Sequence, residues 1–189
     1  METQRLERIE AAYRDAAAGT TPAAALADAD WELRQAALHA VRRHPTPDAA
    51  AAVYAALRTE DARDVYGQTE GELLGWGAGH THAHLNEQAR QLPAETLEAW
   101  KCRWRGKQAA CLALGALAAA FGAGTLPAGA IDRLATIARD RDGEDYQVRA
   151  AACEALAAIG TPAARDALRD VAEHEEEFCT LTQAKKGLA

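Results

Sequence analysis

The stretch DGEDYQVRAAACEALAAIGTPAARDAL, residues 142–168, contains one complete unit of the pattern that organises this chain. Its segment YQVRAAACEAL begins with an aromatic ring, has a base three residues later, and continues with alanine and leucine at helical spacing. The Gly-Thr-Pro that follows is typical of a helix boundary, because threonine caps a helix and proline fits its first turn. The stretch therefore predicts two successive α-helices joined by a short turn.

The same pattern recurs along the chain. It is clear in WELRQAALHAV from Trp31 and WRGKQAACLAL from Trp104, and weaker in YGQTEGELLGW from Tyr66 and FCTLTQAKKGL from Phe178. A proline precedes each of the intervening helices, at Pro22, Pro47, Pro93, Pro127 and Pro162. Because self-similarity at a fixed period indicates a repeat protein, we predict an all-α fold, an α-α solenoid of about five helix-turn-helix units.

The predicted solenoid fills a single domain, residues 1–189. Residues 1–19 are expected to form an N-terminal capping helix, with Leu6, Ile9 and Tyr13 on its packing face. Alanine accounts for 49 of the 189 residues, and its small side chain allows helices to pack closely. Ala36, Ala37, Ala110, Ala152 and Ala155 are expected to be buried between the stacked helices.

The residues that carry a family resemblance are DADWELRQAALHAV and DGEDYQVRAAACEALAAIGTPAARDAL. In these the chain resembles the HEAT-repeat family, particularly its short bacterial branch, the HEAT-like repeats of phycobilisome lyases. The resemblance implies an acid in the turn about six residues before the base, a place that Asp28 has before Arg34 and Asp142 nearly has before Arg149. It also implies a concave surface, lined by the second helices, that binds a partner.

The charge balance limits the possible partners. With 28 acids against 21 bases the net charge is −7, which makes nucleic acid an unlikely partner because phosphate binding needs a positive field. No apolar segment is long enough to cross a membrane, so we expect no membrane partner and a cytoplasmic location. The four cysteines lack the spacing of a metal site and are expected to be buried thiols.

One interval of the pattern is too long. Successive prolines are 25, 46, 34 and 35 residues apart, and the excess in the second interval contains GWGAGHTHAHLNE, residues 75–87. We predict an irregular insertion there. His80, His82, His84 and Glu87 could together bind zinc, although the usual zinc spacings are missing and a polar surface loop is favoured. No cofactor is expected.

The binding site is predicted at the second and third units, between Tyr66 and Lys107. The segment WKCRWRGKQ, residues 100–108, combines tryptophan with dense positive charge, and these residue types are enriched where interfaces gain most of their energy. An acidic protein or peptide is the expected partner. The predicted binding residues are Trp76, Trp100, Lys101, Arg103, Trp104, Arg105 and Lys107. Trp104 and Lys107 are also the ring and base of a repeat, which gives them an alternative structural role.

The favoured function is a non-catalytic protein–protein interaction module or scaffold, because no phosphate loop, nucleophile elbow or catalytic carboxylate pair is found. Two alternatives stay open on resemblance: a bilin-lyase-like subunit, and a HEAT-like alkylpurine DNA glycosylase or DNA-binding protein. The pair His174-Glu175 is similar to the iron-binding pairs of HEAT-repeat deoxyhypusine hydroxylases, but only one such pair occurs. The oligomeric state and the identity of the partner cannot be predicted from the sequence.

Overall fold

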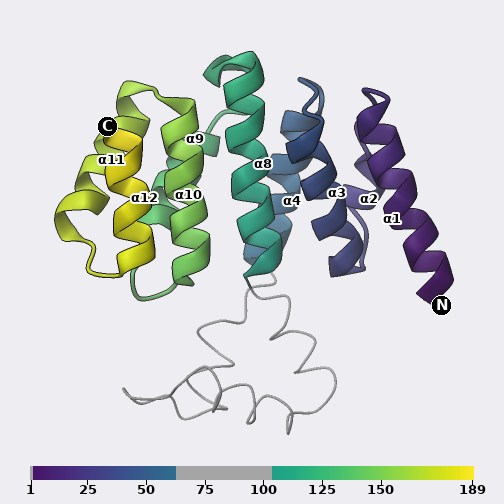
Figure 1. The fold of residues 1–189 in the computed structure, drawn as a ribbon, viewed down its shortest axis with the longest axis horizontal. Helices are drawn as coiled ribbons and strands as arrows, with labels where there is room; N and C mark the ends of the chain where they lie inside the picture. The colour runs from purple at the N-terminus through teal and green to yellow at the C-terminus, as the bar shows by residue number, and fades with distance from the viewer. Residues whose placement is uncertain (1, 63–103) are drawn as a thin grey trace, which may run out of the picture.

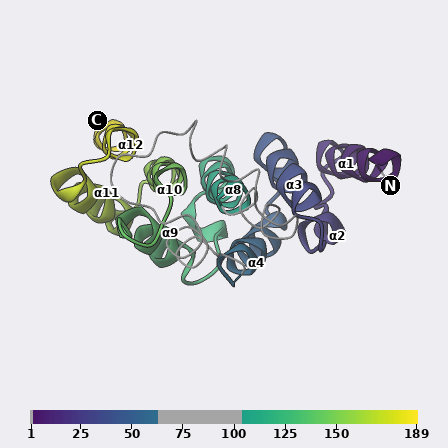
Figure 2. The ribbon, with the colours of Figure 1, turned by 90° about the horizontal axis from the view of Figure 1, so that it is seen from below.

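The computed structural model describes residues 2–62 and 104–189, and every element in these ranges is a helix. Figure 1 shows five of them standing side by side in one row. They are α1 (Glu2–Ala17), α3 (Trp31–Arg43), α8 (Arg105–Phe121), α10 (Tyr146–Ile159) and α12 (Phe178–Leu188). A second row lies behind them, as Figure 2 shows from below. It consists of α2 (Ala23–Leu26), α4 (Ala49–Ala62), α9 (Ala130–Arg139) and α11 (Pro162–His174), with the short 3-10 helix η1 (Ala123–Thr125) after α8.

The two rows confirm the predicted α-α solenoid. Each second-row helix packs on a front-row helix, which gives the pairs α2–α3, α4–α8, α9–α10 and α11–α12. In the front row α8 packs between α3 and α10, although about sixty residues separate α3 from α8 in sequence. The helices predicted from Tyr66 and Pro93 and the insertion at residues 75–87 lie outside the described residues.

Acidic side chains cap the first turns of the front-row helices α3 and α10. A carboxylate of Asp30 accepts a hydrogen bond from the backbone N–H of Glu32 at the start of α3, at 3.0 Å. Asp145 does the same for Gln147 in α10, at 2.8 Å. A negative charge at a helix N-terminus is favourable because it caps free N–H groups and opposes the helix dipole. These two caps place the starts of α3 and α10 at their ring residues, Trp31 and Tyr146.

The predicted threonine–proline start is found at one place only. The Thr161 hydroxyl accepts from the N–H of Ala164, and Pro162 is the first residue of α11. At the other described sites the proline stands one to three residues before the helix. There the threonines have another contact, because the hydroxyls of Thr21 and Thr46 lie 3.2 Å apart and join the turns of neighbouring units.

Small side chains form the contacts between neighbouring front-row helices. Ala37, Ala110, Ala152 and Ala155 are at most 1 % exposed, as predicted. Ala36 is only half-buried, because it lies toward the open side of α3. A Cβ built at Gly115 in α8 would lie 2.8 Å from the Cα of Ala155 in α10. Close backbone approach at this position therefore requires glycine.

Two expectations about the core need correction. In α1, Leu6 is 56 % exposed, Ile9 and Tyr13 are half-buried, and the buried positions are Ala12 and Ala16. Of the described cysteines, Cys111 and Cys153 are buried but Cys179 is exposed. Burial raises the pKa of the Cys153 thiol to about 12, which makes it a packing residue and a poor nucleophile.

Candidate binding site

In the three described repeats that carry a base after the ring, this base is buried and not on the surface. In α3, the Nε of Arg34 donates to the Glu60 carboxylate at the end of α4, at 2.5 Å, and both side chains are at most 5 % exposed. The same guanidinium donates to the backbone carbonyls of Asp28 and Ala29, at 2.7 and 2.9 Å. The acid that the resemblance placed at Asp28 thus contacts Arg34 through its carbonyl, while its carboxylate binds Arg8 of α1.

This arrangement repeats along the solenoid. The Nζ of Lys107 in α8 donates to Glu144, at 2.6 Å, in the loop before α10. Arg149 in α10 pairs with Glu175 in the loop before α12. In these two pairs the base of one front-row helix binds an acid in the loop before the next helix of that row, whereas Arg34 binds an acid at the end of the second-row helix α4. We call these three pairs, Arg34–Glu60, Lys107–Glu144 and Arg149–Glu175, the buried ladder.

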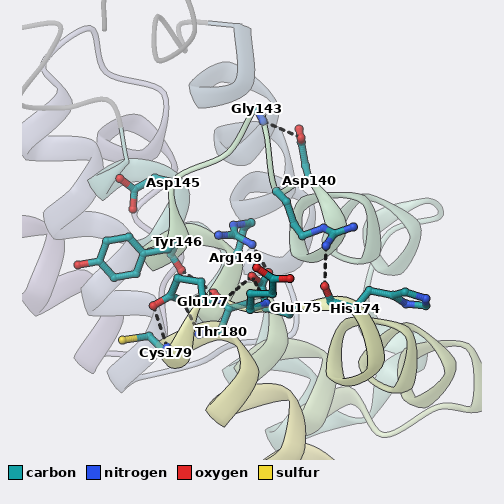
Figure 3. Close-up of polar contacts among 12 residues, drawn as sticks. Asp140, Gly143, Asp145, Tyr146, Arg149, His174, Glu175, Glu177, Cys179 and Thr180 are labelled. Carbon is teal, nitrogen blue, oxygen red and sulfur yellow. Dashed lines mark hydrogen bonds and ion pairs between the residues drawn. The ribbon is translucent and has the colours of Figure 1, made fainter. Parts of the chain in front are cut away.

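The acid-rich segments at residues 140–145 and 173–177 contain buried carboxylates, among them Glu144 and Glu175. Figure 3 shows Arg149 directed at Glu175, beside the segment that leads into α12. Glu177 caps α12 by accepting from the N–H groups of Cys179 and Thr180, at 2.9 and 2.7 Å. Thr180 is itself anchored, because its hydroxyl donates to the carbonyl of Tyr146, at 3.2 Å. The acids therefore organise the contacts between units.

The pair His174-Glu175 has a structural role as well. The backbone carbonyl of His174 accepts a hydrogen bond from the Arg141 guanidinium, at 2.5 Å. The imidazole Nδ1 of His174 lies 3.2 Å from a carboxylate oxygen of Asp170. Glu175 is occupied by Arg149. In residues 2–62 and 104–189 no group of three or more His, Cys, Asp or Glu side chains could hold a metal ion. His80, His82, His84 and Glu87 lie outside these ranges.

The opposite side of the same helices is not covered by other described elements. Residues one, four and eight positions after the rings of α3, α8 and α10 are half-buried or exposed, and so are Arg42, Ala116, Ala119 and Ala158 further along these helices. We call this set on α3, α8 and α10 the concave face, because the front row curves in Figure 2. It consists of Glu32, Gln35, His39, Arg42, Arg105, Gln108, Leu112, Ala116, Ala119, Gln147, Ala150, Glu154 and Ala158.

A groove of about 220 Å³ lies on this face. Its floor is formed by α8 with Leu112, Gly115, Ala116 and Ala119, and by Ala155 and Ala158 of α10. Arg42 of α3 and Glu154 of α10 form an ion pair of 3.1 Å, although α8 stands between their two helices. They reach one another only because the side chains on α8 are small and the row is curved.

The predicted binding residues fall into three groups. Trp76, Trp100, Lys101 and Arg103 lie outside the described residues. Trp104 and Arg105 lie at the start of α8, where the guanidinium stands 4.8 Å from the centre of the indole ring. Lys107 is 3 % exposed and belongs to the buried ladder. The prediction that Lys107 belongs to a binding surface was wrong, because its ammonium group is buried in an ion pair with Glu144.

The residues of the concave face other than Arg105 were missed by the sequence analysis. A signal was present, because most of the face follows from counting one, four and eight residues from each ring.

Comparison with known proteins identifies the family to which these repeats belong. The sequence pattern described as HEAT repeats matches residues 94–189, about half the chain. Neither a curated protein nor a solved structure gives a significant match. None of the described helices is long and apolar enough to span a membrane. The matched residues include α8 to α12 with two pairs of the buried ladder, and the chain belongs to the HEAT-repeat family.

Proposed function

We propose that this protein is a non-catalytic interaction module that holds a segment of a partner protein on its concave face. The observation that carries the proposal is the groove over α8, whose small-residue floor lies between α3 and α10. Such a floor lets the main chain of a partner approach closely. HEAT repeats stack into extended surfaces of this kind, and curved solenoids bind partners along them.

The charges of the face support an acidic partner. Acids outnumber bases by seven in the whole chain, yet the described part of the concave face carries Arg42 and Arg105, with Arg5 beside them. Its acids Glu32 and Glu154 are both held in ion pairs, with Arg5 and Arg42 respectively. The described part of the face therefore has no unpaired acid, and a carboxylate-rich segment would meet little repulsion there.

The predicted residues outside the described ranges extend this proposal. Trp76, Trp100, Lys101 and Arg103 add aromatic rings and positive charge to the chain between α4 and α8. We propose that they contribute to the same partner site, together with Trp104 and Arg105. Aromatic–arginine clusters are the usual centres of binding energy at interfaces.

Site-specific photo-crosslinking tests the proposal. The photoreactive amino acid p-benzoylphenylalanine is placed at Ala119, which is exposed and lines the groove. The matched control places it at Ala163, which is exposed on α11 in the second row. In the native host, position 119 should capture one discrete protein that position 163 does not.

A second variant checks that the captured protein occupies the groove. Ala119→Arg introduces a long charged side chain, and Ala120→Arg makes the same change at the exposed neighbour that does not line the groove. The first should reduce the affinity for the captured protein at least tenfold, and the second should not. Equal capture at positions 119 and 163 would contradict the proposal.

A further inference from the structure

We propose that a pocket between the C-terminal ends of α9 and α11 binds a phosphate monoester, through the guanidinium groups of Arg139 and Arg141 and the imidazole of His174. Both helices belong to the second row (Figure 2), so this site is separate from the concave face and goes beyond the proposed function. The phosphate can belong to a phosphorylated side chain or to a small molecule, because both present the same group.

The pocket has a volume of about 200 Å³. Its basic lining comes from three places: Arg139 ends α9, Arg141 lies in the turn that follows, and His174 ends α11. Arg141 and His174 are 33 residues apart in sequence. The fold therefore gathers three basic side chains from two repeats around one cavity.

Each of these bases is held by a contact that leaves other donors available. The Nε of Arg139 donates to a carboxylate oxygen of Asp170, at 2.6 Å. The Nη1 of Arg141 donates to the carbonyl of His174, at 2.5 Å (Figure 3). A guanidinium carries five N–H donors, so most donors of both arginines have no partner within the described residues. The imidazole Nδ1 of His174 lies 2.9 Å from the carbonyl oxygen of Asp170, and its Nε2 has no partner in the same part of the chain.

The two carboxylates of the pocket are already occupied. One oxygen of Asp170 accepts from Arg139, and the other lies 3.2 Å from the Nδ1 of His174. One oxygen of Glu175 is bound by Arg149, and the other accepts from two backbone N–H groups in the segment before α12, at 3.0 and 2.8 Å. The pocket therefore offers no vacant carboxylate oxygen of the kind that a bound Mg²⁺ or Ca²⁺ ion requires.

The charges at the pocket have a positive excess. Three guanidinium groups, those of Arg139, Arg141 and Arg149, stand against the two carboxylates. Within the described residues Arg141 forms no ion pair, and its hydrogen bond goes to an uncharged carbonyl. The Nε of Arg149 is the one buried side-chain nitrogen or oxygen in these residues that has no hydrogen-bond partner, so Glu175 does not saturate this guanidinium. An anion is therefore the complementary ligand, although the whole chain has a net charge of −7.

Two features of the surroundings oppose an anion, and neither dominates at the pocket. Carbonyl groups at the C-terminal end of a helix repel negative charge, but Arg141 donates to the carbonyl that ends α11. Four further acids are close in sequence but do not line the pocket, namely Asp140, Asp142, Glu173 and Glu176.

The number of donor groups favours a phosphate monoester over a carboxylate. A phosphate monoester has three terminal oxygens and a charge of about −1.5 to −2 at pH 7, and arginine binds such oxygens through two parallel N–H groups. A carboxylate has two oxygens and one charge, so it would leave one of the three bases without a partner. Ala138 and Val171 are buried beside these bases and give an apolar wall for the carbon that carries the phosphate.

Calorimetric titration of the full-length chain tests the ligand class. The probe is a capped peptide, Ala-Ala-Ser-Ala-Ala, phosphorylated at serine. Its controls carry unphosphorylated serine or glutamate at the same place. The phosphopeptide should bind at least tenfold more tightly than either control, because only it presents three oxygens and the second charge. Glycerol 3-phosphate is the second phosphate probe. Tighter binding of the phosphopeptide assigns the ligand to a phosphorylated protein, and the reverse order assigns it to a small molecule.

Variants assign the contact to the pocket. Arg139→Gln and Arg141→Gln should each weaken binding of the tighter phosphate probe at least tenfold, the usual size for a lost hydrogen bond between charged groups. The matched control is Arg165→Gln, because Arg165 is exposed on α11 and does not line the pocket. This variant should bind as the wild type does. Circular dichroism of each variant confirms that the helices are intact.

A readout on the wild type needs no substitution. In nuclear magnetic resonance titrations the Nε–H signals of Arg139 and Arg141 should shift with either phosphate probe, and that of Arg165 should not. Absence of binding, equal binding of the glutamate peptide, or equal losses in Arg141→Gln and Arg165→Gln would overturn the inference. The crosslinking result at Ala119 judges the proposed function separately, since the pocket and the groove share no residue.

Discussion

The buried ladder and the concave face lie on two sides of the same helices and follow opposite rules. In the ladder three described units use a similar solution, in which a base at the same position of a front-row helix pairs with a buried acid. On the concave face equivalent positions differ, since the position eight residues after the ring is His39 in α3, Leu112 in α8 and Glu154 in α10. Contacts between identical units demand identical residues, whereas a partner has no such symmetry. The variable side is therefore where recognition is expected.

The largest expected effect comes from breaking the ladder. Arg149→Ala leaves Glu175 buried without its counter-charge, and removal of one partner of a buried ion pair typically costs about 3–5 kcal/mol. The matched control is Arg169→Ala, because Arg169 pairs with Asp166 on an exposed part of α11. Exposed pairs contribute less than about 1 kcal/mol. Urea denaturation followed by circular dichroism compares the two.

A double variant sharpens this test. Replacing both Arg149 and Glu175 by methionine removes the charges together, and buried pairs replaced in this way often recover most of the lost stability. We expect the double variant to be more stable than Arg149→Ala. If Arg149→Ala cost no more than Arg169→Ala, the ladder would not hold the units together.

The next effect concerns the close approach of α8 and α10. Gly115→Ala would place a Cβ 2.8 Å from the Cα of Ala155 and 3.1 Å from its Cβ. Because backbone must move, we expect a loss of about 1–3 kcal/mol from overpacking. Gly124→Ala is the control, since its new Cβ meets nothing within 4 Å. A smaller loss at Gly115 than at Gly124 in thermal melts would mean that the two helices are less tightly packed than described.

The same contrast explains what the sequence could predict. The rings, the alanines at Ala37 and Ala152 and the bases of the ladder recur at fixed offsets, so one repeat is enough to predict the next. The acids were missed because their offset varies, with Glu144 two residues before its ring and Glu175 three. Glu60 is still harder to predict from the sequence, because more than forty residues separate it from Trp104. Concave-face residues follow no shared pattern, and only the fold brings Arg42 to Glu154.

A moderate effect is expected at the cap of α12. Glu177→Ala removes the acceptor of two backbone N–H groups and should cost about 1 kcal/mol at pH 7. Burial raises the pKa of Glu177, but the hydrogen bonds from Cys179 and Thr180 outweigh it, and the net shift is downward from 4.5. The contribution is therefore full above pH 4.5 and is lost as the pH falls through the lower pKa of the folded state.

Denaturation at pH 7 and at pH 3 measures this change. The difference between wild type and Glu177→Ala should shrink at the lower pH. The exposed neighbour Glu176 provides the control variant, Glu176→Ala, for which we expect a change below about 0.5 kcal/mol. A pH-independent difference at Glu177 would show that the cap does not act through its charge.

The smallest expected effect is on the pH dependence of stability, and it comes from His39 on the concave face. Burial lowers the pKa of His39 from 6.5, and the neighbouring charges of Arg42 and Arg43 lower it further. As the pH falls below 6.5 the unfolded chain takes up the proton more readily than the folded one, so stability decreases until the pH passes below the folded pKa.

His39→Gln keeps a polar side chain and removes this titration. Between pH 7.5 and 5.5 the variant should therefore lose less stability than the wild type, measured by urea midpoints, while the carboxylates contribute equally to both. Arg43→Gln should reduce the pH dependence in part, because it removes one of the charges that oppose protonation. Equal pH dependence in wild type and His39→Gln would mean that His39 is solvated like a surface residue, and that the concave face is shallower at α3 than its half-buried side chains indicate.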